Sequence, residues 1–183
     1  IATGTGTISW PSKHLNLEAK IVGAEVSDWF SEAGGFATAN VIIRGTLDKP
    51  EATGRAEILT GNFHEEPIPI LVGDLRLDKD KVVVSNLSAV RGASRVDGEV
   101  SYNFNSESIV GQLHGNGIQL ADLLGKDYGG SISLKETKFS GTLRNPIVNS
   151  QIEGVGLIVQ GVRIDSLVAK LSLVDDVAAT DGV

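Results

Sequence analysis

Apolar and polar residues alternate along most of the chain. The alternation is clearest over residues 37–43 and in an earlier run that contains Leu15, Leu17, Ala19 and Ile21. A period of two is typical of a β-strand that buries one face. The pattern also predicts strands around residues 56–62, 68–77, 82–89 and 95–104, with turns at residues 48–50 and 78–81. The strands should therefore form a sheet with one apolar face and one polar face.

Two short helices are expected between the strands. The first is predicted at residues 24–33, where Ser27 or Asp28 can cap the start and Gly34 with Gly35 ends the helix. The second is predicted at residues 119–126, before the glycine pair at residues 129–130. Both are short enough to lie across an end of a sheet.

The chain contains an internal repeat. The sequence Gly-Thr-Leu-x-x-Pro occupies residues 45–50 and returns 96 positions later at residues 141–146. Alignment of Gly4 with Gly98 defines repeat units of approximately residues 4–97 and 98–183, the second of them truncated. The second copy has an extra residue near Lys135 or Glu136, and after it the apolar residues move from one set of alternate positions to the other. This shift predicts a β-bulge. Residues 1–183 are interpreted as a single continuous β-repeat segment of a larger protein.

These elements predict an all-β, mostly antiparallel fold with one or two short helices. A twisted sheet of roughly ten strands seldom stays flat, so a long curved or coiled sheet is expected. The apolar face of such a sheet must be covered by a second layer, by its own edges or by a ligand. Whether that face is an open groove or a closed core is left open by the pattern.

Charge and composition narrow the possible functions. The formal net charge is −7 and no cluster of Lys and Arg is present, which excludes nucleic acid as the expected partner. The chain has no cysteine, so it has neither disulfides nor thiolate metal sites. The densest polar cluster, His64-Glu65-Glu66, lacks a second histidine at ligand spacing and is interpreted as a turn before Pro67. No metal, no cofactor and no catalytic residues are predicted, so the chain is not expected to be an enzyme.

The repeated motif and its surroundings resemble a known family. Each Gly-Thr-Leu-x-x-Pro is followed by a Leu-x-Leu strand, at residues 75–77 and 171–173, and residues 83–89 read Val-Val-Ser-Asn-Leu-Ser-Ala. With the short apolar helix before a glycine pair, this arrangement resembles the C-terminal region of the TamB family, within the AsmA-like group of bridge proteins.

The resemblance implies a groove-like half-pipe with an apolar interior. It also implies a protein of the periplasm of a Gram-negative-type bacterium, anchored in the inner membrane. Its expected partners are an Omp85-class outer-membrane barrel protein and either phospholipid or nascent outer-membrane protein strands. The implied function is lipid transfer between the two membranes, assistance to barrel-protein assembly, or both.

Eleven apolar residues are predicted to line this interior and to bind lipid or client. They are Val41, Ile43, Leu47, Val100, Tyr102, Phe104, Leu113, Phe139, Leu143, Leu171 and Leu173. The alternative is a structural β-repeat of a secreted or surface adhesin-like protein, in which these residues form a fully packed core. A hydrolase is disfavoured because no nucleophile, base or metal constellation is present.

Overall fold

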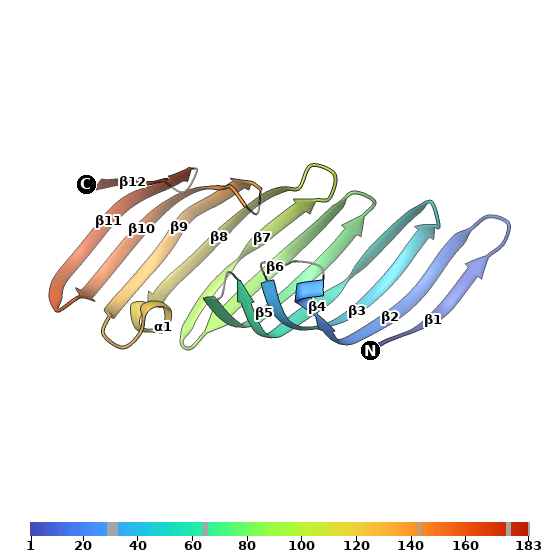
Figure 1. The fold of residues 1–183 in the computed structure, drawn as a ribbon, viewed down its shortest axis with the longest axis horizontal. Coiled ribbons are helices and arrows are strands. Elements are labelled where there is room, and N and C mark those ends of the chain that lie inside the picture. The colour runs from blue at the N-terminus through green and yellow to red at the C-terminus, as the bar shows by residue number, and fades with distance from the viewer. Residues whose placement is uncertain (29–32, 64–65, 143, 175–176, 183) are drawn as a thin grey trace. The chain divides into compact units, whose positions relative to one another are not determined.

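The computed structural model of the chain describes residues 1–28, 33–63, 66–142, 144–174 and 177–182 (Figure 1). Within these residues the fold is all-β. The twelve strands are β1 (Ala2–Ser9), β2 (His14–Glu25), β3 (Ala33–Thr46), β4 (Lys49–Phe63), β5 (Glu66–Asp78), β6 (Lys81–Arg91), β7 (Ser94–Asn103), β8 (Ser108–Gln119), β9 (Gly129–Gly141), β10 (Pro146–Val159), β11 (Val162–Val174) and β12 (Val177–Gly182). Two short helical segments accompany them, the 3-10 turn η1 (Val26–Asp28) and the helix α1 (Leu120–Leu124).

The chain forms two compact units, residues 1–89 and residues 90–183. In the first unit β1 to β5 are neighbours in sequence order, and in the second unit β7 to β12 are neighbours in sequence order. Successive strands pair antiparallel within each unit. Strand β6 spans the boundary between the two ranges. The all-β, antiparallel prediction is confirmed, and each predicted strand lies largely within an observed one.

The helix predictions were too long. Of the predicted helix at residues 24–33, the described part contains only η1, because Ala24 and Glu25 pair with β3 and Ala33 already belongs to that strand. Helix α1 has five residues and ends at Gly125, whose φ is +101°. The glycine pair predicted to end it begins β9 instead. Antiparallel pairing of Ala24, Glu25, Ala33 and Gln119 satisfies backbone groups that a longer helix would otherwise use.

The repeated motif forms the same hairpin turn in both units. Its glycines, Gly45 and Gly141, have φ of +96° and +100°, and an added Cβ would lie 2.5 Å from the carbonyl oxygen of Lys49 or Asn145, respectively. The threonine after each glycine accepts a hydrogen bond from the backbone N–H three residues later, at 3.2 Å in the first copy and 3.1 Å in the second. Glycine is therefore required at this turn for both conformation and space.

The proline of the motif has a different place from the predicted one. The turn of the first copy consists of residues 47 and 48, and Pro50 lies in β4, paired with Gly45. Proline is compatible with strand pairing near the end of a strand, where a ladder hydrogen bond is dispensable. The prediction of a turn at residues 48–50 was therefore displaced toward the C-terminus.

The predicted β-bulge is confirmed in β9. From Leu113 to Gly115 strand β8 advances by two residues, while its partner β9 runs from Thr137 to Leu134, an advance of three. The pairing of β9 with β10 shows a register shift over the same stretch. The extra residue places both Leu134 and Thr137 on one face of the sheet.

Candidate functional site

The apolar face of the first unit consists of three cross-strand rows. Directly paired residues of antiparallel strands point to the same side of a sheet, so the pairings define the rows. The rows are Gly6, Leu17, Ile43, Ala52 and Leu77; Gly4, Ala19, Val41, Gly54 and Leu75; and Ala2, Ile21, Ala39, Ala56 and Gly73. All fifteen residues are apolar or glycine, so this face carries no charge.

The opposite face of the first unit carries its charged groups, together with an exposed apolar row of Phe36, Leu59 and Ile70. Arg55 Nη1 donates a hydrogen bond of 2.8 Å to Asp74 Oδ1, and Asn86 Nδ2 donates one of 2.8 Å to Asp74 Oδ2. The hydrogen bond from Asn86, followed by that from Arg55, lowers the pKa of the Asp74 carboxyl. These contacts hold neighbouring strands in register on the solvent side.

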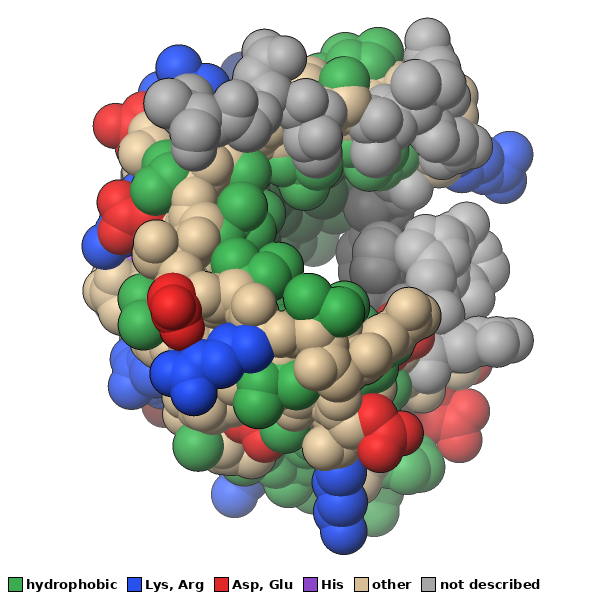
Figure 2. All heavy atoms as spheres, turned by 90° about the vertical axis from the view of Figure 1, so that its left-hand side faces the viewer, with side chains coloured by type: hydrophobic (Ala, Val, Ile, Leu, Met, Phe, Trp, Pro, Cys, Tyr) green, Lys and Arg blue, Asp and Glu red, His purple; other side chains and the backbone are tan. Residues whose placement is uncertain are grey.

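The apolar face of the second unit has the corresponding rows. They are Val100, Gly111, Phe139, Val148 and Leu173; Gly98, Leu113, Thr137, Ser150 and Leu171; and Gly115, Leu134, Ile152 and Ala169. Figure 2, which faces the C-terminal end, shows that the second unit is hollowed and that hydrophobic side chains gather on the wall of the hollow. The rows of the two units correspond at the spacings of 94 to 96 residues that the repeat predicts.

Two hydroxyl groups interrupt the apolar face of the second unit. The Thr137 and Ser150 oxygens lie 2.6 Å apart in a hydrogen bond, and the residues are only 6% and 7% exposed. Each hydroxyl thus satisfies the other inside an otherwise apolar surface. The corresponding positions of the first unit are Val41 and Gly54, which need no such partner.

Most predicted site residues lie on these faces. Val41 and Ile43 belong to the first unit, and Val100, Leu113, Phe139, Leu171 and Leu173 belong to the second, where Tyr102 extends the apolar face by pairing with Ile109. All eight residues are half-buried. The eleven predicted site residues include none of the glycines and alanines of the rows, although the same alternation contains them, as at Ala19.

Three predicted site residues are not placed on the faces. Leu47 lies in a hairpin turn and is 50% exposed, and Phe104 also lies in a turn and is 46% exposed. Both corrections have one cause: the strand ends before the residue, so the alternation no longer sets the side chain's direction. The Phe104 ring instead contacts Tyr102 edge-on, with centroids 5.4 Å apart. Leu143 lies outside the described residues.

The apolar faces have no second layer over them in the described part of the chain. Each unit is a single sheet, and its fully buried apolar residues are few: Leu15, Val26, Ala39, Ala52, Ile118, Leu120 and Leu157. The accessible surface is 11,721 Å². Two separate compact units that share the 19.2 kDa mass equally would expose about 10,200 Å². The excess surface agrees with sheets whose apolar faces are partly exposed.

Among the described residues no group of three or more His, Cys, Asp and Glu side chains is arranged to hold a metal ion. His64 and Glu65 of the polar cluster lie outside the described residues. Within the described ranges no helix has the length and apolar character needed to cross a membrane.

Comparison with protein-family models, with curated proteins and with solved structures finds no match for the chain. The site is therefore interpreted from its own geometry. What it defines is a class of surface: an antiparallel sheet, repeated in sequence, with a partly exposed apolar face in each unit.

Proposed function

We propose that the chain is a non-enzymatic segment of a TamB-like protein that spans the periplasm and that its apolar faces bind phospholipid acyl chains during transfer between the inner and outer membranes. The observation that carries this proposal is the half-buried apolar face that no second layer covers within the described residues. In water such a surface favours a ligand that buries it.

An acyl chain fits the chemistry of these faces better than a polypeptide strand does. The backbone N–H and C=O groups of the strands inside each unit are directed to neighbouring strands. A peptide lying on the face would find no backbone partner there, and each buried unpaired group costs about 1–3 kcal/mol. A methylene group has no such requirement and contributes about 0.8 kcal/mol when buried.

Assistance to outer-membrane barrel assembly is a second candidate. It would use a strand edge, because a client strand can add to an unpaired edge through backbone hydrogen bonds. Strand β1 pairs on one side with β2 and with no described strand on the other, and all its residues are exposed. Both candidates place the full-length protein in the periplasm, anchored in the inner membrane, with an Omp85-class barrel as partner, and both rest on the resemblance in turn motif and strand spacing.

Site-specific photo-crosslinking tests the proposal. A photo-reactive residue at Val41 or Leu171 lies on an apolar face, while matched controls at Asn40 and Lys170 lie next to them on the polar face. We expect phospholipid adducts from the first pair and none from the second, with co-purified lipid visible by native mass spectrometry. Equal labelling from both faces, or no lipid at all, would refute the proposal and favour the packed adhesin-like repeat.

A further inference from the structure

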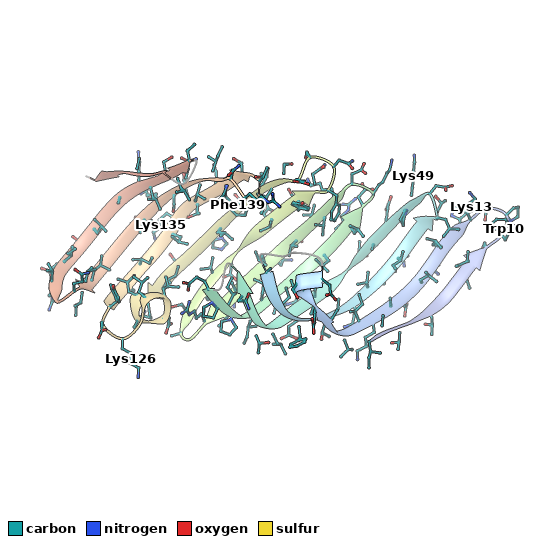
Figure 3. All side chains as sticks on the ribbon, in the orientation of Figure 1. Trp10, Lys13, Lys49, Lys126, Lys135 and Phe139 are labelled. Atoms are coloured by element: carbon teal, nitrogen blue, oxygen red, sulfur yellow. The ribbon has the colours of Figure 1, made fainter. Side chains whose placement is uncertain are left out.

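The ring of Phe139 lies over a glycine of the neighbouring strand. Phe139 in β9 pairs with Gly111 in β8 (Figure 3). A Cβ built on Gly111 would overlap Phe139 Cζ and lie 2.9 Å from Phe139 Cε1. The ring therefore occupies the space that the Cβ of any other residue at position 111 would fill.

Other glycines on the apolar face of the second unit are covered in the same way. A Cβ on Gly98 would lie 2.8 Å from Leu113 Cδ2, and a Cβ on Gly115 would lie 2.8 Å from Ile118 Cδ1. With Gly111 beneath Phe139, each of these glycines has an apolar side chain over it. The floor of the second unit is therefore smooth at the places where a missing side chain would leave a pit.

The first unit differs at the corresponding positions. Its equivalent of the Gly111–Phe139 pair is Leu17 and Ile43, two aliphatic side chains of similar size. Two glycines of its rows lie under side chains as well, because a Cβ on Gly6 would lie 2.8 Å from Leu17 Cδ2 and a Cβ on Gly73 would overlap Val84 Cγ1. The difference between the units is therefore the aromatic ring of Phe139 over Gly111, which stands in place of two aliphatic side chains.

We propose that Phe139 is a specificity-determining residue, which makes the second unit select straight acyl chains over methyl-branched ones. This inference rests on the proposed lipid-binding function. A straight chain contacts a smooth floor along its whole length, whereas a methyl branch needs a recess and lifts neighbouring methylenes from the surface. Loss of one methylene contact of about 0.8 kcal/mol corresponds to about a fourfold weaker binding.

The test uses vesicles of phosphatidylcholine with either straight or methyl-branched acyl chains of equal carbon number. Photo-crosslinking from Leu171 reports on the second unit, and crosslinking from Val41 reports on the first. In the unaltered chain we expect straight-chain adducts at Leu171 to exceed branched ones about fourfold. In Phe139→Ala, which opens a pit over Gly111, the ratio at Leu171 should fall toward one while the ratio at Val41 stays unchanged. Ile43→Ala is the matched control and should leave the ratio at Leu171 as it was.

A second pair of variants separates the ring from a general loss of structure. Gly111→Ala should lift the ring into the hollow and reduce both kinds of adduct at Leu171. Because the added Cβ would also lie 2.5 Å from the carbonyl oxygen of Glu99, the double variant Gly111→Ala/Phe139→Ala is needed. Recovery of adducts in the double variant assigns the effect to the ring; no recovery assigns it to the backbone and overturns this role.

The outcomes distinguish the inference from the proposed function. No lipid adduct in the unaltered chain refutes lipid binding itself. Adducts without a preference at Leu171, or a preference that survives in Phe139→Ala, refute only the role of Phe139. The conservative variant Phe139→Leu, which retains an apolar side chain over Gly111, should keep part of the preference, so the inference is tested even where Phe139→Ala unfolds.

Discussion

Replacement of Gly54 by alanine should force two paired strands apart. Gly54 lies in β4 opposite Val41 in β3. An added Cβ would overlap the carbonyl oxygen of Asn40 and lie 2.9 Å from the Val41 Cα. Both are backbone atoms, so no side-chain rotation relieves the clash. Because φ at Gly54 is outside the left-handed region, alanine can adopt this backbone conformation, so the destabilisation of Gly54→Ala reports the steric clash and not backbone strain.

The expected destabilisation follows from three contributions. Overfilling a packed site costs about 1–3 kcal/mol. Loss of a ladder hydrogen bond beside Gly54 adds about 1 kcal/mol. Alanine restricts the unfolded chain more than glycine does, which raises the free energy of unfolding by about 0.4–1 kcal/mol and offsets part of this loss. The free energy of unfolding of the first unit should therefore fall by about 1–3.5 kcal/mol, which shifts a urea midpoint by about 1 M at the middle of that range.

Gly4→Ala provides the matched control, since Gly4 lies in the same row. Its added Cβ would lie 3.1 Å from the Glu18 carbonyl oxygen and 3.8 Å from the Ala19 Cα, so a shift of a few tenths of an ångström suffices. Urea unfolding followed by circular dichroism, with hydrogen exchange of the β3 and β4 amides, compares the two variants. A Gly54→Ala midpoint as high as that of Gly4→Ala would refute the idea that close strand approach requires this glycine.

Three other outcomes follow from specific contacts. Asp122→Ala removes the acceptor of three hydrogen bonds, from the backbone N–H groups of Ala93 and Ser94 and from Ser94 Oγ, and should destabilise the second unit by about 2–3 kcal/mol in a urea titration. The pKa of Asp74 is lowered in the folded chain, so the ionised carboxylate stabilises the fold fully above the ordinary pKa of an aspartate, and this stabilisation is lost as the pH falls through the lowered pKa. In Asp74→Asn the free energy of unfolding should therefore depend less steeply on pH below about pH 4. An unchanged pH dependence would contradict this. Thr137→Val leaves one buried hydroxyl without its partner and should cost about 1–2 kcal/mol; adding Ser150→Ala should recover part of that loss in a double-mutant cycle.

The alternation of apolar and polar residues predicted the strands because side-chain direction in a strand is fixed by the backbone. Leu17, Val41 and Leu171 lie on the predicted faces for this reason. The same rule failed at Leu47 and Phe104, one or a few residues beyond a strand end, where the turn sets the direction. The β-bulge could be predicted because the one-residue shift in the apolar–polar alternation of the second copy is itself visible in the sequence.

The helix lengths and the floor of the apolar faces could not be predicted in the same way. Ala24 has no strong preference against a helix, and only its pairing with Ala37 across the sheet places it in a strand. The covering of Gly111 by Phe139 depends on register across two strands that are separated by helix α1 and its flanking turn. Single-chain periodicity contains no information about such a cross-strand neighbour.

The differences between the two copies indicate what each part of the repeat does. Gly45 and Gly141 are unchanged because a positive φ and a nearby carbonyl oxygen leave no other residue possible. At most positions of the apolar faces, by contrast, the residue changes and its apolar character is kept, as where Leu17 and Ile43 correspond to Gly111 and Phe139. The exception is the hydroxyl pair Thr137 and Ser150, which stands in place of Val41 and Gly54. The proposed binding of methylene chains requires an apolar surface and no particular side chain on it. Variation at these positions is compatible with that proposal, and the Phe139 ring over Gly111 is the feature of the second unit that the first unit lacks.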